Sequence, residues 1–183
     1  MTIRLLAYRT KNTKMSQEAM YENEQFVEEV NYVDGIRNGL SKIWHDNGQL
    51  KEEGNYVDGK ANGIFQYWRE NGQLYIEVNL VDGKENGLFK TWHHNGQLIE
   101  EINYVDGERN GLHQIWHANG QLQYKINYVD GEANGLYQHW YINGQLCWEV
   151  NYVDGEMNGL YQSWSEDGQK KEDVYYVNGI KTL

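Results

Sequence analysis

The chain has no proline and a single cysteine, Cys147, among its 183 residues. One cysteine excludes an internal disulfide and a metal site built from several thiolates. No stretch approaches the roughly 20 apolar residues that a membrane-spanning helix needs. The first 14 residues are basic, but their apolar run is broken by Arg4 and no small-residue cleavage site follows. The sequence therefore predicts a cytoplasmic protein with no secretory signal and no membrane insertion.

Basic residues are also few, with 16 Lys and Arg against 27 Asp and Glu, a net charge of -11. The first 14 residues carry four basic side chains and no acid, which leaves 12 basic and 27 acidic residues, or -15, on the remainder. Such a surface repels nucleic acids and anionic lipid headgroups. We therefore expect no nucleic-acid partner. The charge suits a basic protein partner, although acidity can also simply keep a thin β-protein soluble.

The chain is polar, with a mean hydropathy of -0.84, yet 14% of its residues are aromatic. Disordered chains are poor in aromatic residues. The polarity therefore indicates a folded protein with much exposed surface, such as a thin and elongated one.

One sequence motif is repeated six times with a period of 24 residues, and no residue is inserted or lost between copies. Each copy carries one tryptophan and one turn glycine at fixed positions. These structural repeat residues are Trp44, Trp68, Trp92, Trp116, Trp140 and Trp164, with Gly48, Gly72, Gly96, Gly120, Gly144 and Gly168. Strict phasing of this kind is typical of supersecondary units that stack on their neighbours.

Two glycine-centred turn signals alternate within each unit, x-Asn-Gly and Asp-Gly-x-x-Asn-Gly. Short runs rich in Tyr, Trp, Leu, Val and Ile lie between them, and no pattern of helical length appears. Each unit is therefore predicted to be a β-hairpin. The fold class is all-β: an elongated single-sheet antiparallel meander, twisted or curled into a groove. At two strands per unit, each repeat would add about 10 Å.

The pattern also selects a turn type at Asp46-Asn47-Gly48. A two-residue loop would pair Trp44 with Lys51 and split the apolar residues between both faces. A three-residue loop pairs Trp44 with Leu50 and keeps the recurring Leu, Trp, Ile or Val and Tyr residues on one face, so that Leu50 and residues 52, 54 and 56 share the face of Leu40 and Trp44. We predict this loop, a type I turn with a G1 bulge in which Gly48 is left-handed.

The two faces of the predicted sheet differ. The recurring Trp and Leu face is interpreted as the structural lining, and the variable face as the place where a partner binds, because aromatic residues are enriched in interfaces. The candidate partner-binding residues are Phe65, Tyr67, Tyr75, Phe89, Ile99, Ile115, Tyr137, Tyr141 and Tyr161. Two alternatives stay open. These side chains could only stabilise the sheet as cross-strand pairs, or the two faces could have the opposite roles.

The domain boundaries follow the repeat. Residues 23–183 form the array, with six full units and partial units at both ends. Residues 1–22 depart from the motif and are expected to be a cap or disordered.

No constellation of residues points to catalysis. The aspartates that precede the turn glycines recur about 10 Å apart, too far for adjacent repeats to share a Ca²⁺ ion. The histidines are too widely spaced for zinc, and Cys147 has no base placed beside it by the pattern. The sequence predicts a protein that is not an enzyme and that has no catalytic residues, cofactor or metal.

These repeats resemble the MORN repeat, in the bacterial variant with the signature YxDGxxNGxxxxWxxNGQL, over residues 23–179. The resemblance implies stacked β-hairpins in a grooved sheet. It also implies roles known for such proteins, namely scaffolding or dimerisation, lipid association, and antitoxin-like or immunity-like binding in the bacterial variant.

Taken together, the predicted function is a protein-binding repeat module, in its sharpest form an antitoxin or immunity protein that masks a basic toxin or effector. The regularly spaced Trp and Tyr residues also suit a carbohydrate-binding array, and the resemblance suits a self-assembling or lipid-associated scaffold. Free strand edges or an apolar face could pair two chains into a homodimer.

Overall fold

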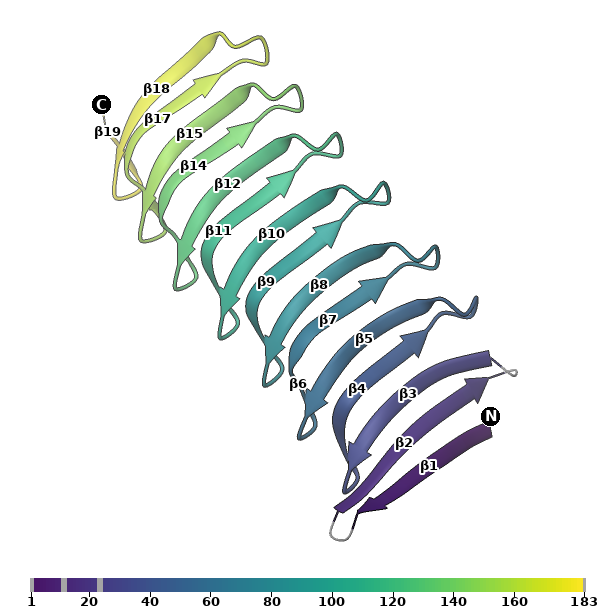
Figure 1. The fold of residues 1–183 in the computed structure, drawn as a ribbon. Helices are drawn as coiled ribbons and strands as arrows, with labels where there is room; N and C mark the ends of the chain where they lie inside the picture. The colour runs from purple at the N-terminus through teal and green to yellow at the C-terminus, as the bar shows by residue number, and fades with distance from the viewer. Residues whose placement is uncertain (1, 11–12, 23–24, 183) are drawn as a thin grey trace. The chain divides into compact units, whose positions relative to one another are not determined.

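The computed structural model describes residues 2–10, 13–22 and 25–182, which form strands and turns. Two compact units divide the chain, Met1–Gly87 and Leu88–Leu183. Within each unit, successive strands pair antiparallel and run back and forth in chain order (Figure 1). The predicted all-β antiparallel meander is confirmed. Nowhere in the described ranges is there a helix long and apolar enough to cross a membrane.

The strands of the first unit are β1 (Thr2–Thr10), β2 (Thr13–Glu22), β3 (Gln25–Val33), β4 (Ile36–Trp44), β5 (Leu50–Val57), β6 (Lys60–Ala61), β7 (Gly63–Trp68) and β8 (Leu74–Val81). The strand β9 (Lys84–Trp92) contains the boundary between the units. The second unit continues with β10 (Leu98–Val105), β11 (Glu108–Trp116), β12 (Leu122–Val129), β13 (Glu132–Ala133), β14 (Gly135–Trp140), β15 (Leu146–Val153), β16 (Glu156–Met157), β17 (Gly159–Trp164), β18 (Lys170–Val177) and β19 (Ile180–Thr182).

The N-terminal segment, residues 1–22, contributes the strands β1 and β2. The second of these pairs with β3, the first strand of the predicted array. Residues 1, 11 and 12 of the segment lie outside the described residues.

The predicted three-residue turn is present. The backbone N–H of His45 donates to the carbonyl of Gln49 at 2.8 Å, and the N–H of Gly48 donates to the carbonyl of His45 at 2.8 Å. Gly48 has a φ of 83°, so it is the left-handed residue that a G1 bulge requires. Trp44 lies opposite Leu50, as predicted. The six turn glycines have φ values from 79° to 84°.

The Asp-Gly dipeptides form tighter turns. Asp34 and Gly35 have φ values of 49° and 82°, and they connect Val33 directly to its partner Ile36. Two successive positive φ values define a type I′ turn, which matches the twist of the flanking strands. Six aspartates share this conformation, with φ from 48° to 53°.

The Asn-Gly pair that follows each of these turns is a separate bulge. Ile102 lies opposite His113, and Tyr104 lies opposite Arg109, so one strand gains two residues between these pairs. The side chain of Asn103 donates a hydrogen bond across this bulge to the carbonyl of Asn110 at 2.9 Å. The motif Asp-Gly-x-x-Asn-Gly therefore encodes a turn and a bulge.

A further bulge, not predicted, follows the three-residue turns after Trp44, Trp68, Trp116, Trp140 and Trp164. Trp44 pairs with Leu50 but the preceding residue, Ile43, pairs with Glu52, which leaves Lys51 as an extra residue. One extra residue reverses the faces of all the residues that follow it in the strand. The prediction that Leu50 and residues 52, 54 and 56 share the face of Trp44 is therefore wrong beyond Leu50.

The core of each unit is one line of side chains at the centre of successive strands. In the second unit, for example, His113 lies opposite Ile126 and Tyr137 lies opposite Val150. We call this line the inner row and its side of the sheet the inner face. Its members are Val30, Ser41, Gly54, Phe65 and Val78 in the first unit, and Ile102, His113, Ile126, Tyr137, Val150, Tyr161 and Val174 in the second.

Most inner-row side chains are buried although each unit is a single layer of strands, and Tyr137 and Tyr161 are half-buried. Ile102 and Val150 are both 0% exposed. Rings from neighbouring positions cover the row: Tyr137 lies 4.6 Å from Trp148 and 5.9 Å from Tyr152, measured between ring centroids. Such aromatic contacts stabilise the sheet beyond the area that they bury.

Side chains at the turns join each repeat to the next. Asn143 donates to the carbonyl of Glu166 at 2.8 Å, and the Asn119 side chain donates to the carbonyl of Ile142 at 2.8 Å. At the opposite end of the strands, Asn110 donates to the carboxylate of Asp130 at 3.2 Å. These bonds span one repeat step, which explains why the 24-residue period tolerates no insertion.

Candidate functional site

The nine residues proposed from the sequence as a partner-binding face do not form one exposed surface: Tyr75 is the extra residue of a bulge and Tyr141 lies at a three-residue turn. Phe65, Tyr137 and Tyr161 belong to the inner row itself. Phe65 is only 2% exposed, so the prediction that its ring is available to a partner is wrong. The other eight are half-buried, namely Tyr67, Tyr75, Phe89, Ile99, Ile115, Tyr137, Tyr141 and Tyr161.

The aromatic rings of the inner face pack against one another. In the first unit, Tyr67 contacts Tyr75 with ring centroids 6.5 Å apart. In the second unit, His139 stacks on Trp148 with parallel rings 5.5 Å apart, and Trp148 lies 6.2 Å from Tyr161. These contacts correspond to the cross-strand pairs that the sequence offered as an alternative to binding.

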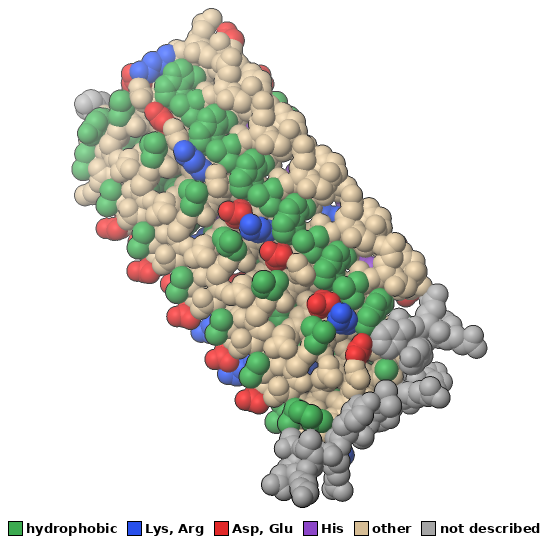
Figure 2. All heavy atoms as spheres, in the orientation of Figure 1, with side chains coloured by type: hydrophobic (Ala, Val, Ile, Leu, Met, Phe, Trp, Pro, Cys, Tyr) green, Lys and Arg blue, Asp and Glu red, His purple; other side chains and the backbone are tan. Residues whose placement is uncertain are grey.

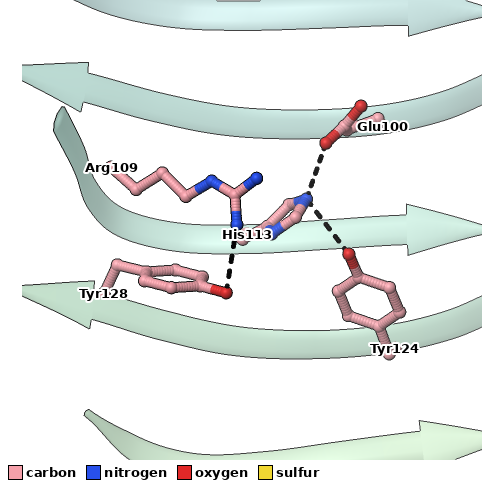
Figure 3. A network of polar contacts seen from close by, with 5 residues as sticks. All are labelled: Glu100, Arg109, His113, Tyr124 and Tyr128. Atoms are coloured by element: carbon pink, nitrogen blue, oxygen red, sulfur yellow. Dashed lines mark hydrogen bonds and ion pairs between the residues drawn. The ribbon is translucent and has the colours of Figure 1, made fainter. Parts of the chain in front are cut away.

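A polar cluster occupies the inner face of the second unit (Figure 3). His113 donates from Nε2 to Glu100 Oε1 at 2.8 Å, because a carboxylate can only accept, and the Tyr124 hydroxyl lies 3.4 Å from the same nitrogen. Arg109 donates to the Tyr128 hydroxyl at 3.3 Å and stands over that ring, 5.3 Å from its centroid.

This cluster combines groups used in acid–base chemistry, but its geometry is that of a core. His113 is 2% exposed and contacts the rings of Tyr124 and Tyr128. Burial, with the nearby Tyr137 and the negative charge of Glu100, raises the pKa of Tyr124 to about 12. The Tyr124 phenol therefore stays protonated at neutral pH. A substrate atom cannot reach His113 without displacing these rings, so the cluster fits a packing role.

The opposite side of the sheet, which we call the outer face, carries the exposed apolar residues. The leucine column has one member per repeat, each 41–58% exposed: Leu40 and Ile64 in the first unit, and Leu88, Leu112, Leu136 and Leu160 in the second. The valine column lies beside it, each member 41–46% exposed: Val57 and Val81 in the first unit, and Val105, Val129, Val153 and Val177 in the second.

Polar pairs and the tryptophans complete the outer face. Lys42 pairs with Glu53 at 2.9 Å and Lys90 pairs with Glu101 at 2.9 Å. The tryptophans are half-buried, and Lys125 lies over the ring of Trp140 at 5.7 Å. Figure 2 shows rows of hydrophobic side chains with basic and acidic side chains between them. Because the bulge reverses the faces of the residues that follow it in the second strand, the Trp and Leu residues lie on the side opposite the inner row.

One repeat position on the outer face changes its charge between the units. It is the residue opposite the valine column, immediately after the Asp-Gly turn. In the first unit Val57 faces Lys60, and Lys84 occupies the same position one repeat later. In the second unit the position holds Glu108, Glu132 and Glu156, opposite Val105, Val129 and Val153.

The sequence alone did not indicate the leucine and valine columns as a surface, because the bulge at Lys51 is invisible in the alternating pattern. One signal for the true core was present. Gly54 stands where other repeats have Val or Ile, and Phe65, on the next strand, supplies the missing volume. This exchange of size between positions 54 and 65 places them in contact, on the same face.

The fold and these surfaces define a repeat protein of stacked β-hairpins whose outer face is apolar and charged. A family model described as the MORN repeat variant matches five segments, residues 37–58, 61–82, 85–106, 109–130 and 157–178. These five segments of 22 residues cover 110 of the 183 positions, and the chain belongs to this family. MORN repeats are generally modules that bind proteins or lipids. No curated protein matches the chain.

Proposed function

We propose that the chain is a non-enzymatic, cytoplasmic protein-binding module whose partner is a basic protein, masked in the manner of a toxin bound by an antitoxin or immunity protein. The observation that carries this proposal is the leucine column. It places one large aliphatic side chain per repeat in solvent, with a valine beside it. Regular exposed apolar surface of this kind marks interaction sites on soluble proteins.

The free energy that a partner would gain by burying the leucine column supports a protein partner. Full burial of a leucine side chain contributes about 1.5–3 kcal/mol. Because each member of the leucine column is about half exposed, a partner that covers it gains roughly 1 kcal/mol per residue. The six members together contribute roughly 6 kcal/mol before the cost of association is subtracted, and the valine column and charge attraction add to this.

Charge selects the partner. The array after residue 14 carries -15, which opposes nucleic acid and anionic lipid and favours a basic protein. The thiol of Cys147 is free, as is usual in a reducing compartment. The aromatic rings of the inner face contact one another, so a stacked sugar would have to displace them. The carbohydrate-binding alternative therefore has less support than protein binding.

Affinity capture from native lysate, with the full chain as bait, tests this function. Two matched baits replace the exposed column in one unit each: Leu40→Ser with Ile64→Ser, and Leu112→Ser with Leu136→Ser and Leu160→Ser. Circular dichroism confirms that each bait is folded. We expect the wild-type chain to enrich proteins of high isoelectric point, and at least one column variant to lose them.

Raising the salt concentration from 0.05 to 0.5 M should weaken the capture, because charge attraction is screened. Enrichment that neither variant reduces would contradict the proposal, as would a folded bait that captures no basic protein. Binding of the wild-type chain to a glycan array would support the carbohydrate alternative instead.

A further inference from the structure

The two units can be compared by the net charge of their residues and by where that charge lies. Residues 1–87 contain 10 basic and 14 acidic residues, a net charge of -4, whereas residues 88–183 contain 6 basic and 13 acidic residues, a net charge of -7. The basic residues of positions 1–14 account for this difference, because residues 15–87 alone contain 6 basic and 14 acidic residues, a net charge of -8. The arrays of the two units differ instead in the sign of one charge beside the apolar columns. The second unit has glutamate at the position that Lys60 and Lys84 occupy in the first.

The three glutamates lie on the outer face, directly beside the apolar surface. Register pairs Glu108 with Val105, and the same pairing recurs for Glu132 with Val129 and for Glu156 with Val153. Paired residues of antiparallel strands project to the same side of the sheet. Three successive repeats of this unit therefore present a valine, a carboxylate and, further along the strand, a leucine.

These carboxylates are exposed and uncompensated. Lys60 of the first unit forms an ion pair with Asp82 at 3.9 Å. Over the described ranges, Glu108, Glu132 and Glu156 form no salt bridge. Exposed, unpaired charge of one sign raises the local concentration of an oppositely charged partner and guides its encounter.

The spacing of the leucine column matches the rise of an α-helix over seven residues. Equivalent residues of adjacent repeats lie two strands apart, about 10 Å. Seven residues of an α-helix also rise about 10.5 Å, so a helix lying across the strands places one side chain per heptad over each member of the leucine column. Leu88, Leu112, Leu136 and Leu160 make three such steps, about 30 Å, the length of roughly 20 helical residues.

An extended segment fits this surface less well. Residues on one side of a strand recur every 6.6–6.8 Å, approximately, and fall out of step with a repeat of about 10 Å. The apolar stripe of an amphipathic helix is broad enough to cover the leucine and valine columns together, since they are separated by two residues along a strand, about 7 Å.

From this match of spacing and charge, we propose that the outer face of the second unit binds a basic amphipathic helix of the partner protein. Apolar residues of the helix cover the leucine and valine columns, and its Lys and Arg residues face Glu108, Glu132 and Glu156. This inference rests on the proposed function and specifies its surface.

A synthetic probe tests the surface directly. It is a 21-residue amidated peptide with a leucine stripe in heptad spacing and lysines along one flank of the stripe. A scrambled peptide of the same composition and a peptide with glutamate in place of lysine are the controls. Fluorescence anisotropy of the labelled peptides, titrated with the full chain at 50 mM salt, gives the dissociation constants. We expect the helical basic peptide to bind at least tenfold more tightly than either control.

The most informative variant takes its residues from the equivalent repeat position in the first unit. Glu108→Lys, Glu132→Lys and Glu156→Lys together install the residue that the first unit tolerates at the same position. This variant should bind the basic peptide at least thirtyfold more weakly and the acidic peptide more tightly than the wild-type chain. The Leu112→Ser, Leu136→Ser and Leu160→Ser variant should bind at least tenfold more weakly, whereas Leu40→Ser with Ile64→Ser should change the affinity less than threefold.

Several results would overturn the assignment. They are equal affinity for the basic and scrambled peptides, unchanged affinity in the lysine variant, or tighter binding of anionic phosphatidylserine vesicles than of neutral ones. A self-association that the leucine-to-serine variant abolishes would show a second copy of the chain on this face instead. If the wild-type and lysine-variant baits capture the same basic protein from lysate, the proposed function stands and this surface is wrong. If the wild-type bait captures none, the proposed function itself fails.

Discussion

Replacing Gly54 by valine adds a side chain where the ring of Phe65 already lies. A Cβ atom built on Gly54 would stand 2.1, 2.2 and 2.5 Å from three atoms of that ring. Such distances are far below van der Waals contact, and Phe65 is 2% exposed, so the ring must leave its position. Overpacking of this kind costs about 1–3 kcal/mol of folding free energy.

The reverse change, Phe65→Val, empties the space over Gly54. Truncation of a buried phenylalanine to alanine costs about 3–5 kcal/mol, and we expect somewhat less for valine, about 2–4 kcal/mol. Part of this loss is the edge-to-face contact with Tyr56, whose ring centroid lies 5.5 Å away. Gly54→Val in the Phe65→Val background returns apolar volume to the same space. The double variant should therefore be more stable than the sum of the single effects by about 2 kcal/mol or more.

Urea unfolding of the full chain, followed by far-ultraviolet circular dichroism and tryptophan fluorescence, measures this coupling in a double-mutant cycle. Ile64→Val is the matched control, since this side chain is on the outer face and 58% exposed, and it should cost less than about 0.5 kcal/mol. Additivity of the two core substitutions within about 0.5 kcal/mol would refute the packing described for Gly54 and Phe65.

Three further predictions follow from single side chains. Burial, together with His117, lowers the pKa of His139 below its ordinary 6.5. The unfolded chain therefore binds the proton at higher pH than the folded chain, so the free energy of unfolding should fall as the pH drops below about 6.5. In urea unfolding between pH 7.5 and 5, His139→Phe should reduce this dependence on pH. Asn143→Ala removes the hydrogen bond to the carbonyl of Glu166 and should cost about 1 kcal/mol, whereas an unchanged urea midpoint would speak against the coupling of turns. Burial raises the pKa of Tyr67 to about 12 and that of Tyr124 to about 12, so ultraviolet titration at 295 nm should give a late phase that Tyr67→Phe and Tyr124→Phe each reduce.

The local architecture could be predicted from the sequence because it depends on residues close together in the chain. The Asp46-Asn47-Gly48 turn required a left-handed residue, and only Gly48 supplies one without strain. The 24-residue period predicted hairpins in series because each unit must bury its apolar residues against its neighbours.

Which residues lie on which face of the sheet could not be predicted in the same way. Alternation assigns residues to faces only while pairing is regular, and one unpaired residue, Lys51 in the hairpin of β4 and β5, shifts the alternation. Alternation alone therefore groups Leu40 and Trp44 with Gly54 and Tyr56, which lie on the opposite side. For the same reason, it predicts Phe65 to be a surface residue. The acidic position at Glu108, Glu132 and Glu156 became meaningful only when register placed it beside the valine column.

The inner row is the core of each unit, and we propose the leucine column as the binding surface. Hydroxyl-radical footprinting of the full chain, with and without the basic peptide and normalised for intrinsic reactivity, tests both parts at once. We predict that Leu112, Leu136 and Leu160 are oxidised in the free chain and protected by the peptide, while Phe65 and His113 are protected in both states. Rapid oxidation of Phe65 and His113 in the native chain, or peptide protection confined to Tyr137 and Tyr161, would contradict the account.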